Sequence, residues 1–304
     1  MTPAATTPLV AQRMQVRQRL TDYLALTKPR VVLMVLITTF VGYYLGSTAD
    51  LHVVPLLHVL VGTALAAGGT MALNQFMERH RDAYMLRTRH RPLPDGRLAP
   101  SEGLAFGLAL TVAGLVYLHL SIGALTAGLT ATIAATYLLI YTPLKPVTSL
   151  CSLVGAIPGA LPPVVGWAAA RNEVGFEAWL LFAIMFLWQV PHTLAIGTLY
   201  RDDYARAGIR VLPVVDWSGT SSGTHSVTNC LALLPVALMP TLVGMAGAVY
   251  FVAALLLSTG LLATAVALKR SGAPADARRL LLASLAYLPI LLAVMAFDRH
   301  PLLP

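Results

Sequence analysis

One stretch decides the fold and the chemistry of this chain, namely Asn74-Gln75-Phe76-Met77-Glu78-Arg79-His80-Arg81-Asp82-Ala83-Tyr84-Met85-Leu86-Arg87-Thr88-Arg89-His90-Arg91-Pro92-Leu93-Pro94. It begins where the apolar run 52–73 ends. If the helix of that run continues, Asn74, Glu78 and Asp82 recur every four residues and share one face. Their oxygen atoms are the kind of ligand that Mg²⁺ binds, usually together with water and a substrate phosphate.

Two arginines follow these candidate metal ligands. The planar guanidinium groups of Arg87 and Arg91 are suited to phosphate oxygens. The stretch therefore predicts a diphosphate and metal site at a membrane surface. We expect its acids to be unburied there, so that removal of one would leave no buried charge unpaired. The alternative is a solvated loop whose acidic and basic residues form i,i+4 pairs.

The composition predicts an integral membrane protein. Of the 304 residues, 57% are hydrophobic and only 11% are charged, whereas soluble domains carry about 25% charged residues. Cys151 and Cys230 lie inside apolar runs without metal-ligand spacing, so we expect them to be packing residues. The formal net charge of +8 would suggest nucleic acid in a soluble protein, but here we expect no nucleic-acid partner and examine how the charge is distributed.

Nine apolar runs predict an all-α protein with nine transmembrane helices. Residues 1–27 lack the layout of a cleaved signal peptide and are expected to form a cytoplasmic segment with a short surface helix. Residues 28–304 then form a single transmembrane domain. The predicted spans are 31–48, 53–74, 103–119, 122–142, 150–170, 178–198, 224–246, 248–268 and 279–297.

The distribution of Lys and Arg predicts the orientation. With nine alternating spans, 19 of the 21 cationic residues fall on one side, and only Arg171 and Arg299 fall on the other. Cytoplasmic loops carry the excess of positive charge. We therefore expect a protein of the bacterial inner membrane, with its N-terminus and active site on the cytoplasmic side and its C-terminus in the periplasm.

A second loop on the same side, at about 199–222, also combines acids with arginines. Asp202 and Asp203 lie there between Arg201 and Arg206. Four helices separate this loop from the first, as expected if two related halves face one central cavity. Repetition of the pattern favours the site over the solvated loop.

Two further motifs lie near these loops. Lys145 is the only cation of its loop and is either a phosphate ligand or an ordinary positive-inside anchor. Trp188-Gln189-Val190-Pro191-His192 places polar side chains inside the sixth span. His192 is therefore either a helix-to-helix hydrogen-bonding residue or a ligand. A transporter is a further hypothesis, but none of the acids falls near the middle of a span, where transporters generally place one.

These motifs resemble a known family. Asn74-x-x-x-Glu78-x-x-x-Asp82-x-x-Met85-x-Arg87-Thr88-x-x-Arg91-Pro92-Leu93 is similar to the signature of the UbiA-type intramembrane prenyltransferases, in the branch that farnesylates protohaem IX. The same branch is resembled by Thr27-Lys28-Pro29-Arg30, Tyr141-Thr142-Pro143-Leu144-Lys145, Trp188-Gln189-x-Pro191-His192 and Asp203-Tyr204-x-x-Ala207-Gly208-Ile209. One departure is that Tyr200 and Tyr204 stand where quinone-type members carry a second pair of aspartates.

The resemblance implies a nine-helix fold around a central cavity and transfer of a farnesyl group from farnesyl diphosphate to a vinyl group of haem B, with Mg²⁺ as cofactor. Transfer to a quinone precursor or another aromatic molecule is the alternative within the family. The expected partners are the two substrates, the lipid bilayer and a downstream haem-modifying membrane enzyme. The expected metal ligands are Asn74, Glu78, Asp82, Asp202 and Asp203; the diphosphate ligands are Arg87, Arg91, Lys145 and Arg201; the catalytic residues are Glu78, Asp82, Arg87, Lys145 and Asp203; and the haem or cavity residues are Trp188, Gln189 and His192.

Overall fold

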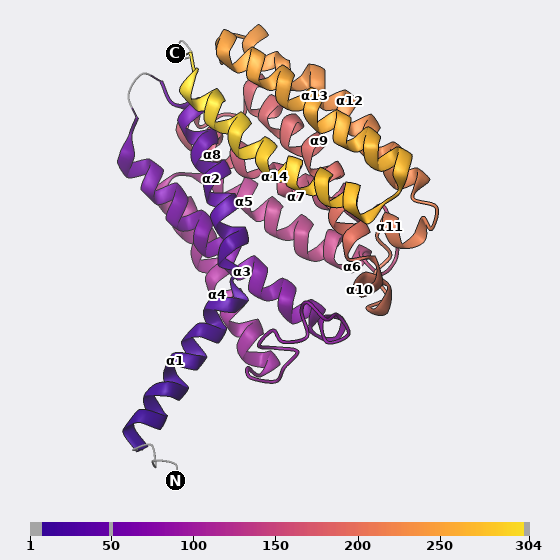
Figure 1. Ribbon diagram of the computed structural model, residues 1–304. Helices are drawn as coiled ribbons and strands as arrows, with labels where there is room; N and C mark the ends of the chain where they lie inside the picture. The colour runs from indigo at the N-terminus through magenta and orange to yellow at the C-terminus, as the bar shows by residue number, and fades with distance from the viewer. Residues whose placement is uncertain (1–7, 49–50, 301–304) are drawn as a thin grey trace.

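A computed structural model describes residues 8–48 and 51–300, which are helical almost throughout and contain no β-strand (Figure 1). The all-α prediction is therefore confirmed for this part of the chain. In order, the elements are α1 (Pro8–Leu26), α2 (Pro29–Gly46), α3 (Val53–Asp82), α4 (Pro100–Ser121), α5 (Ala124–Ala135), the π-helix η1 (Thr136–Tyr141), α6 (Thr142–Leu144), α7 (Cys151–Ala160), α8 (Pro162–Arg171), α9 (Phe176–Leu199), α10 (Arg201–Arg206), α11 (Leu212–Val215), α12 (Thr220–Leu242), α13 (Ala248–Ser271) and α14 (Pro274–Phe297).

The described residues form nine helical segments that are long and apolar enough to cross a membrane, as predicted. Two of these segments are composite: Ala124–Leu144 joins α5, η1 and α6, and Cys151–Arg171 joins α7 and α8. The last span starts at Pro274 instead of residue 279. Proline is favoured in the first turn of a helix, because the N–H that it lacks would have no partner within the helix there. Of the N-terminal segment, α1 covers 8–26, and the prediction for 1–7 lies outside the described residues.

The fifth span is broken where the sequence is richest in proline. α7 ends at Ala160 and α8 begins at Pro162, because Pro162 and Pro163 have no N–H to continue the hydrogen-bonding pattern. α8 packs along α2 at very short range. A Cβ atom on Gly166 would lie 1.9 Å from the backbone oxygen of Thr39. The glycine is what allows the two backbones to approach so closely.

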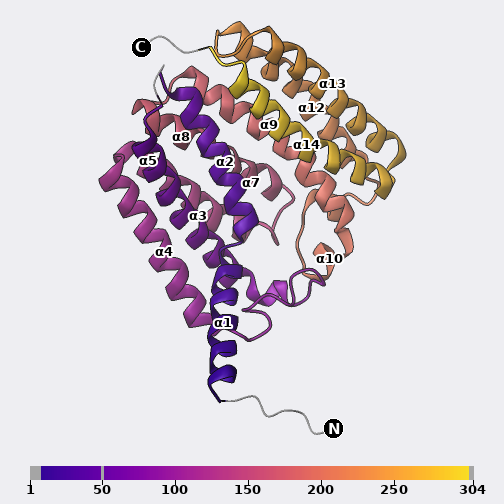
Figure 2. The same cartoon turned by 60° about the vertical axis from the view of Figure 1, so that its left-hand side comes forward.

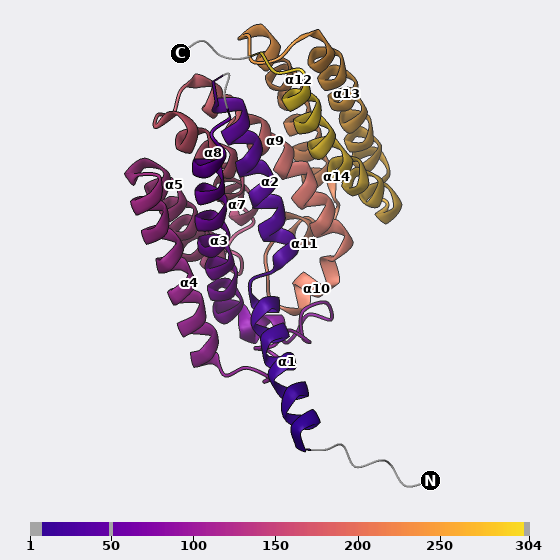
Figure 3. The ribbon, with the colours of Figure 1, turned by 90° about the vertical axis from the view of Figure 1, so that its left-hand side faces the viewer.

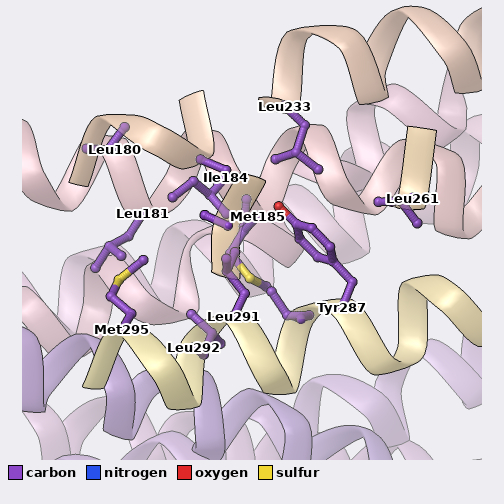
Figure 4. Close-up of a cluster of buried hydrophobic side chains, with 14 of the residues drawn as sticks. Leu180, Leu181, Ile184, Met185, Leu233, Leu261, Tyr287, Leu291, Leu292 and Met295 are labelled. Atoms are coloured by element: carbon purple, nitrogen blue, oxygen red, sulfur yellow. The ribbon is translucent and has the colours of Figure 1, made fainter. Parts of the chain in front are cut away.

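α9 lies at the centre of the second half of the bundle. It packs against α7, α12 and α14, and α12 packs in turn along α13. Figure 4 shows the buried side chains of this region, which come from α9, α12, α13 and α14 and include Leu181, Ile184, Leu233, Tyr287 and Leu291. Cys151 and Cys230 are buried and unpaired, as expected of packing residues.

The two ends of the bundle differ in charge. α1 and α10 lie at one end, and the end of α14 lies at the other (Figures 2 and 3). Arg171 and Arg299, the two cations predicted at the second end, both bond to backbone carbonyls in the last turn of α2: Arg171 Nε donates to Gly46 O over 2.9 Å, and Arg299 Nη1 donates to Tyr44 O. Because the last carbonyls of a helix lack intrahelical partners and carry partial negative charge, these arginines act as caps.

Candidate active site

α3 runs without a break to Asp82, so Asn74, Glu78 and Asp82 lie on one face of its last turns, as predicted. The prediction that these side chains lie unburied at the membrane surface is wrong. Their exposed fractions are 0%, 7% and 4%, respectively. Residues before α2, after α6 and in the loop after α3 lie against this end of the helix. We call these three side chains the α3 oxygen face.

A different cation meets each member of the α3 oxygen face. Lys145 Nζ lies 2.7 Å from Glu78 Oε1, and Arg91 Nη1 lies 2.6 Å from Asp82 Oδ2. Lys28 Nζ donates to Asn74 Oδ1 over 2.8 Å. Burial of a carboxylate is costly unless a partner compensates its charge, so these cations make the buried acids possible.

Sequence reasoning assigned no role to Lys28, although it lies in the Thr27-Lys28-Pro29-Arg30 motif. Its backbone φ is +49°, a left-handed conformation that is uncommon for a residue other than glycine. This turn joins α1 to α2, and Gln75 Nε2 fixes it by donating to Ala25 O and Leu26 O. Burial lowers the pKa of Lys28 to about 7, and the positive charges of Arg91 and Lys145 act in the same direction. The one feature of the sequence that could have indicated a role for Lys28 is its position directly before the first span.

Lys145 is brought to Glu78 by the end of the fourth span. Its Nζ lies 4.5 Å from the centre of the Tyr141 ring, within the range of a cation–π interaction. Burial opposes the charged form, but the neighbouring Tyr141 and Glu78 raise the pKa of Lys145 above its ordinary value. The sequence left two interpretations of Lys145, a phosphate ligand or an ordinary positive-inside anchor. Its position at the α3 oxygen face favours the phosphate ligand.

The loop after α3 folds back onto its helix. Thr88 Oγ1 donates to Asp82 O over 2.9 Å, which holds the loop so that Arg91 reaches the Asp82 carboxylate. Arg87 points elsewhere: its guanidinium carbon lies 5.0 Å from the centre of the exposed Tyr200 ring, on the second loop. Arg91, and not Arg87, is therefore the arginine that contacts the α3 oxygen face.

The second acidic loop packs directly against the first. Met85 forms a small buried cluster with Ala207 and Ile209, and Leu86 N donates to Asp203 Oδ1 over 3.4 Å. Asp203 is buried and also pairs with Arg206, whereas Asp202 is exposed. Within 8–48 and 51–300, no three His, Cys, Asp or Glu residues are close enough to hold a metal ion. The structure therefore does not gather the five expected metal ligands into one cluster.

Arg201 makes no ion pair with the α3 oxygen face in the described part of the chain. Its guanidinium carbon lies 4.1 Å from the centre of the Trp217 ring. Its Nε and Nη2 atoms are buried and have no hydrogen-bond partner in the described part of the chain. Such donors are rarely left unsatisfied, and an anion is one of the partners that they can bind.

The cavity residues of the sixth span contact α14. The Trp188 and His192 rings stack with their centres 4.9 Å apart, and Trp188 Nε1 donates to Ser284 O over 2.9 Å. His192 Nδ1 lies 2.8 Å from Ser284 Oγ. Gln189 lies against Gly159 of α7, and its Oε1 atom is buried and has no hydrogen-bond partner among the described residues. The helix-to-helix hydrogen bond expected of His192 is present, and it engages only one of the two ring nitrogens. The central cavity itself stays a prediction.

The chemistry of the α3 oxygen face fits a hard divalent cation. An amide oxygen and two carboxylates are the donors that Mg²⁺ binds, and it binds them with phosphate oxygens in the remaining positions. The three cations beside them, Lys28, Arg91 and Lys145, are of the kind that binds phosphate. A set of oxygen donors interleaved with cations suits a metal diphosphate better than a bare metal ion.

Comparison with known proteins agrees with this chemistry. The family model described as the UbiA prenyltransferase family matches residues 35–288. A protoheme IX farnesyltransferase of Solibacter usitatus is 46% identical over 287 residues, which cover 91% of this chain and 98% of the relative.

Among solved structures, a digeranylgeranylglyceryl phosphate synthase aligns with a TM-score of 0.79 at 16% identity, covering 92% of this chain and 98% of its own. A UbiA homologue from Archaeoglobus fulgidus, bound to GPP and Mg²⁺, aligns with a TM-score of 0.64 at 16% identity, covering 90% and 99%. The structures share the fold, and the family model covers most of the chain. This chain therefore belongs to the UbiA prenyltransferase family.

Proposed function

We propose that the protein transfers the farnesyl group of farnesyl diphosphate to a vinyl group of haem B, with diphosphate as the leaving group. Water then adds to the cation left on the former vinyl group and loses a proton, which gives the hydroxyethylfarnesyl group of haem O. The observation that carries the diphosphate part is the α3 oxygen face, in which each of three buried oxygen-bearing side chains has its own cation. The acceptor and the length of the prenyl group come from the name of the Solibacter usitatus relative, protoheme IX farnesyltransferase.

Asn74, Glu78 and Asp82 would hold Mg²⁺, which is present with GPP in the Archaeoglobus fulgidus homologue. When bound, the metal ion supplies positive charge to the diphosphate as the allylic C–O bond breaks. Lys28, Arg91 and Lys145 already lie at these side chains and supply further donors to the leaving group. Arg87 and Arg201 lie on the neighbouring loops and would bind outer phosphate oxygens, and Asp203 would fix the first loop through Leu86 N.

The farnesyl chain would extend from this end of the bundle into the apolar interior. The nine spans provide a surrounding without water, which an allylic cation requires until the vinyl carbon attacks. Charge stabilisation of the leaving group and exclusion of water are thus provided by different parts of the fold, the loops for the first and the spans for the second.

His192 is the residue that we assign to haem contact. The Ser284 hydroxyl donates its only proton to Leu281 O over 2.7 Å, so it accepts from His192 Nδ1. Nδ1 then carries the ring proton, and Nε2 keeps a free lone pair. A neutral imidazole in this tautomer is the form that ligates metal ions.

The decisive experiment uses the purified full-length chain in lipid vesicles with haem B, labelled farnesyl diphosphate and Mg²⁺. Chromatography of the extracted pigments should show label on a haem. If the label is transferred only when a quinone precursor replaces haem B, haem B is not the acceptor. If it is transferred to neither molecule, the proposed function is wrong.

A prediction for His192 separates haem binding from prenyl chemistry. In His192→Ala the Nε2 ligand is lost, so the haem absorption spectrum of the bound complex should change. The KM for haem should rise by at least about tenfold, since even outer-shell partners of metal ligands contribute about 10- to 100-fold. The KM for farnesyl diphosphate should not change, because His192 contacts α14 and not the α3 oxygen face. An unchanged haem spectrum in this variant would contradict the assignment.

The second prediction concerns sidedness. After Cys151 and Cys230 are replaced, a cysteine in place of Asp95 should be protected from a membrane-impermeant thiol reagent added to intact spheroplasts, whereas one in place of Glu173 should react. Both positions are exposed in the structure, and they follow an even and an odd number of spans, respectively. The reason is the concentration of cations at the Asp95 end. Labelling of the Asp95 position from outside would contradict the cytoplasmic placement of the site.

A further inference from the structure

We propose that Thr142 is a positioning residue that turns the oxygen of the Asn74 amide, and not its nitrogen, toward the metal diphosphate. This inference rests on the proposed function, because it takes Asn74 to be a metal ligand. Thr142 begins α6 directly after the π-helix η1, and only 2% of its surface is exposed. Asn74 is fully buried, and its Nδ2 atom donates to Thr142 Oγ1 over 3.1 Å.

The orientation of Asn74 matters because only one end of an amide can ligate a cation. The oxygen has lone pairs, and the NH₂ group has only protons to donate. An amide side chain rotated by 180° would point its NH₂ group at the metal ion and contribute no ligand. A residue that fixes the rotation therefore decides whether Asn74 acts at all.

Thr142 fixes the nitrogen end. Its hydroxyl has a single proton, which it donates to Tyr137 O over 2.8 Å. The hydroxyl oxygen can then only accept from Asn74, so the amide group facing Thr142 must be the NH₂ donor.

Lys28 fixes the oxygen end independently. The charged form of Lys28 has three donors and no acceptor, so in that form the Asn74 atom that lies 2.8 Å from Lys28 Nζ is Oδ1. The constraints from Thr142 and Lys28 agree. Because the oxygen has two lone pairs, one remains for a metal ion when the other faces Lys28.

The π-helix gives Thr142 its unusual acceptor. Threonine hydroxyls in α-helices bond to a carbonyl three or four residues earlier, as Thr130 does to Thr126 O over 2.9 Å. In the wider turn of η1 both the Thr142 N–H and its hydroxyl bond to Tyr137 O, five residues earlier. π-Helical turns are frequent at functional sites. Here the turn presents the hydroxyl oxygen to α3.

The test uses Mn²⁺ as the probe and the purified full chain, with the free Mn²⁺ signal measured by electron paramagnetic resonance in the presence of a non-reactive farnesyl diphosphate analogue. Thr142→Val keeps the shape and removes the hydroxyl, so the Mn²⁺ affinity should fall about 10- to 100-fold, as for other partners that orient a metal ligand. Thr142→Ser, which keeps the hydroxyl, should stay within about threefold of the wild type. The matched control is Thr130→Val, which removes a buried hydroxyl of the same span and should not change the affinity.

A second pair of variants separates orientation from packing. Asn74→Asp places an oxygen at both ends of the side chain, so the loss caused by Thr142→Val should shrink to less than about threefold in that background. An equal loss in both backgrounds, or wild-type affinity in Thr142→Val, would overturn the inference. If Thr142→Val does not fold, Thr142→Ala takes its place in the same comparison. Failure of the wild-type chain to bind Mn²⁺ or to farnesylate haem would overturn the proposed function instead, and this inference with it.

Discussion

Glu78→Gln and Asp82→Asn are each expected to reduce farnesyl transfer by at least about 100-fold, since even the outer-shell partners of metal ligands contribute about 10- to 100-fold. The amide side chains keep the size and a hydrogen-bonding oxygen, but they remove the negative charge that holds a divalent cation. Label transfer from farnesyl diphosphate to haem B measures the loss.

These substitutions are preferred to alanine because of the burial of the site. Glu78→Ala would leave Lys145 unpaired and only 14% exposed, and breaking a buried pair in this way costs about 3–5 kcal/mol of stability. Asp276→Asn, which alters a carboxylate at the start of α14 that pairs with Arg279, is the control and should retain the wild-type rate. Wild-type transfer by Asp82→Asn at saturating Mg²⁺ would rule out the metal assignment.

Gly166→Ala is expected to lower the free energy of unfolding by about 3 kcal/mol or more, at the upper end of the range for overpacked positions. The added Cβ would lie 1.9 Å from Thr39 O and 2.6 Å from Tyr43 N. Both atoms belong to the backbone of α2, so no side-chain rotation relieves the overlap and the two helices must separate. Thermal unfolding in detergent micelles measures the effect.

The matched control is Gly128→Ala in α5, where nothing lies within 4 Å of the added Cβ atom. Because alanine is a better helix former than glycine, this variant should be unchanged or more stable by up to about 1 kcal/mol. Equal unfolding temperatures for the two variants would show that the contact between α2 and α8 is not as tight as the structure places it.

The spans and the register of the α3 oxygen face follow from the amino-acid sequence alone. Both depend on local properties: a run of about 20 apolar residues crosses a bilayer whatever its neighbours, and a spacing of four places Asn74, Glu78 and Asp82 on one side of any helix that contains them. The family signature added the chemistry expected of that face.

The contacts of those side chains, in contrast, depend on the tertiary structure. Lys28 reaches Asn74 across 46 positions and Lys145 reaches Glu78 across 67, and no local pattern specifies which of many cations will be neighbours. For the same reason, the positions of the arginines in the sequence did not indicate their different contacts. Arg91 binds Asp82, whereas Arg87 lies on Tyr200. Burial of the acids followed from the way Lys145 after α6 and Arg91 of the loop after α3 pack against them. A pairing between distant residues is fixed by the packing of whole helices, which the sequence of any one segment does not contain.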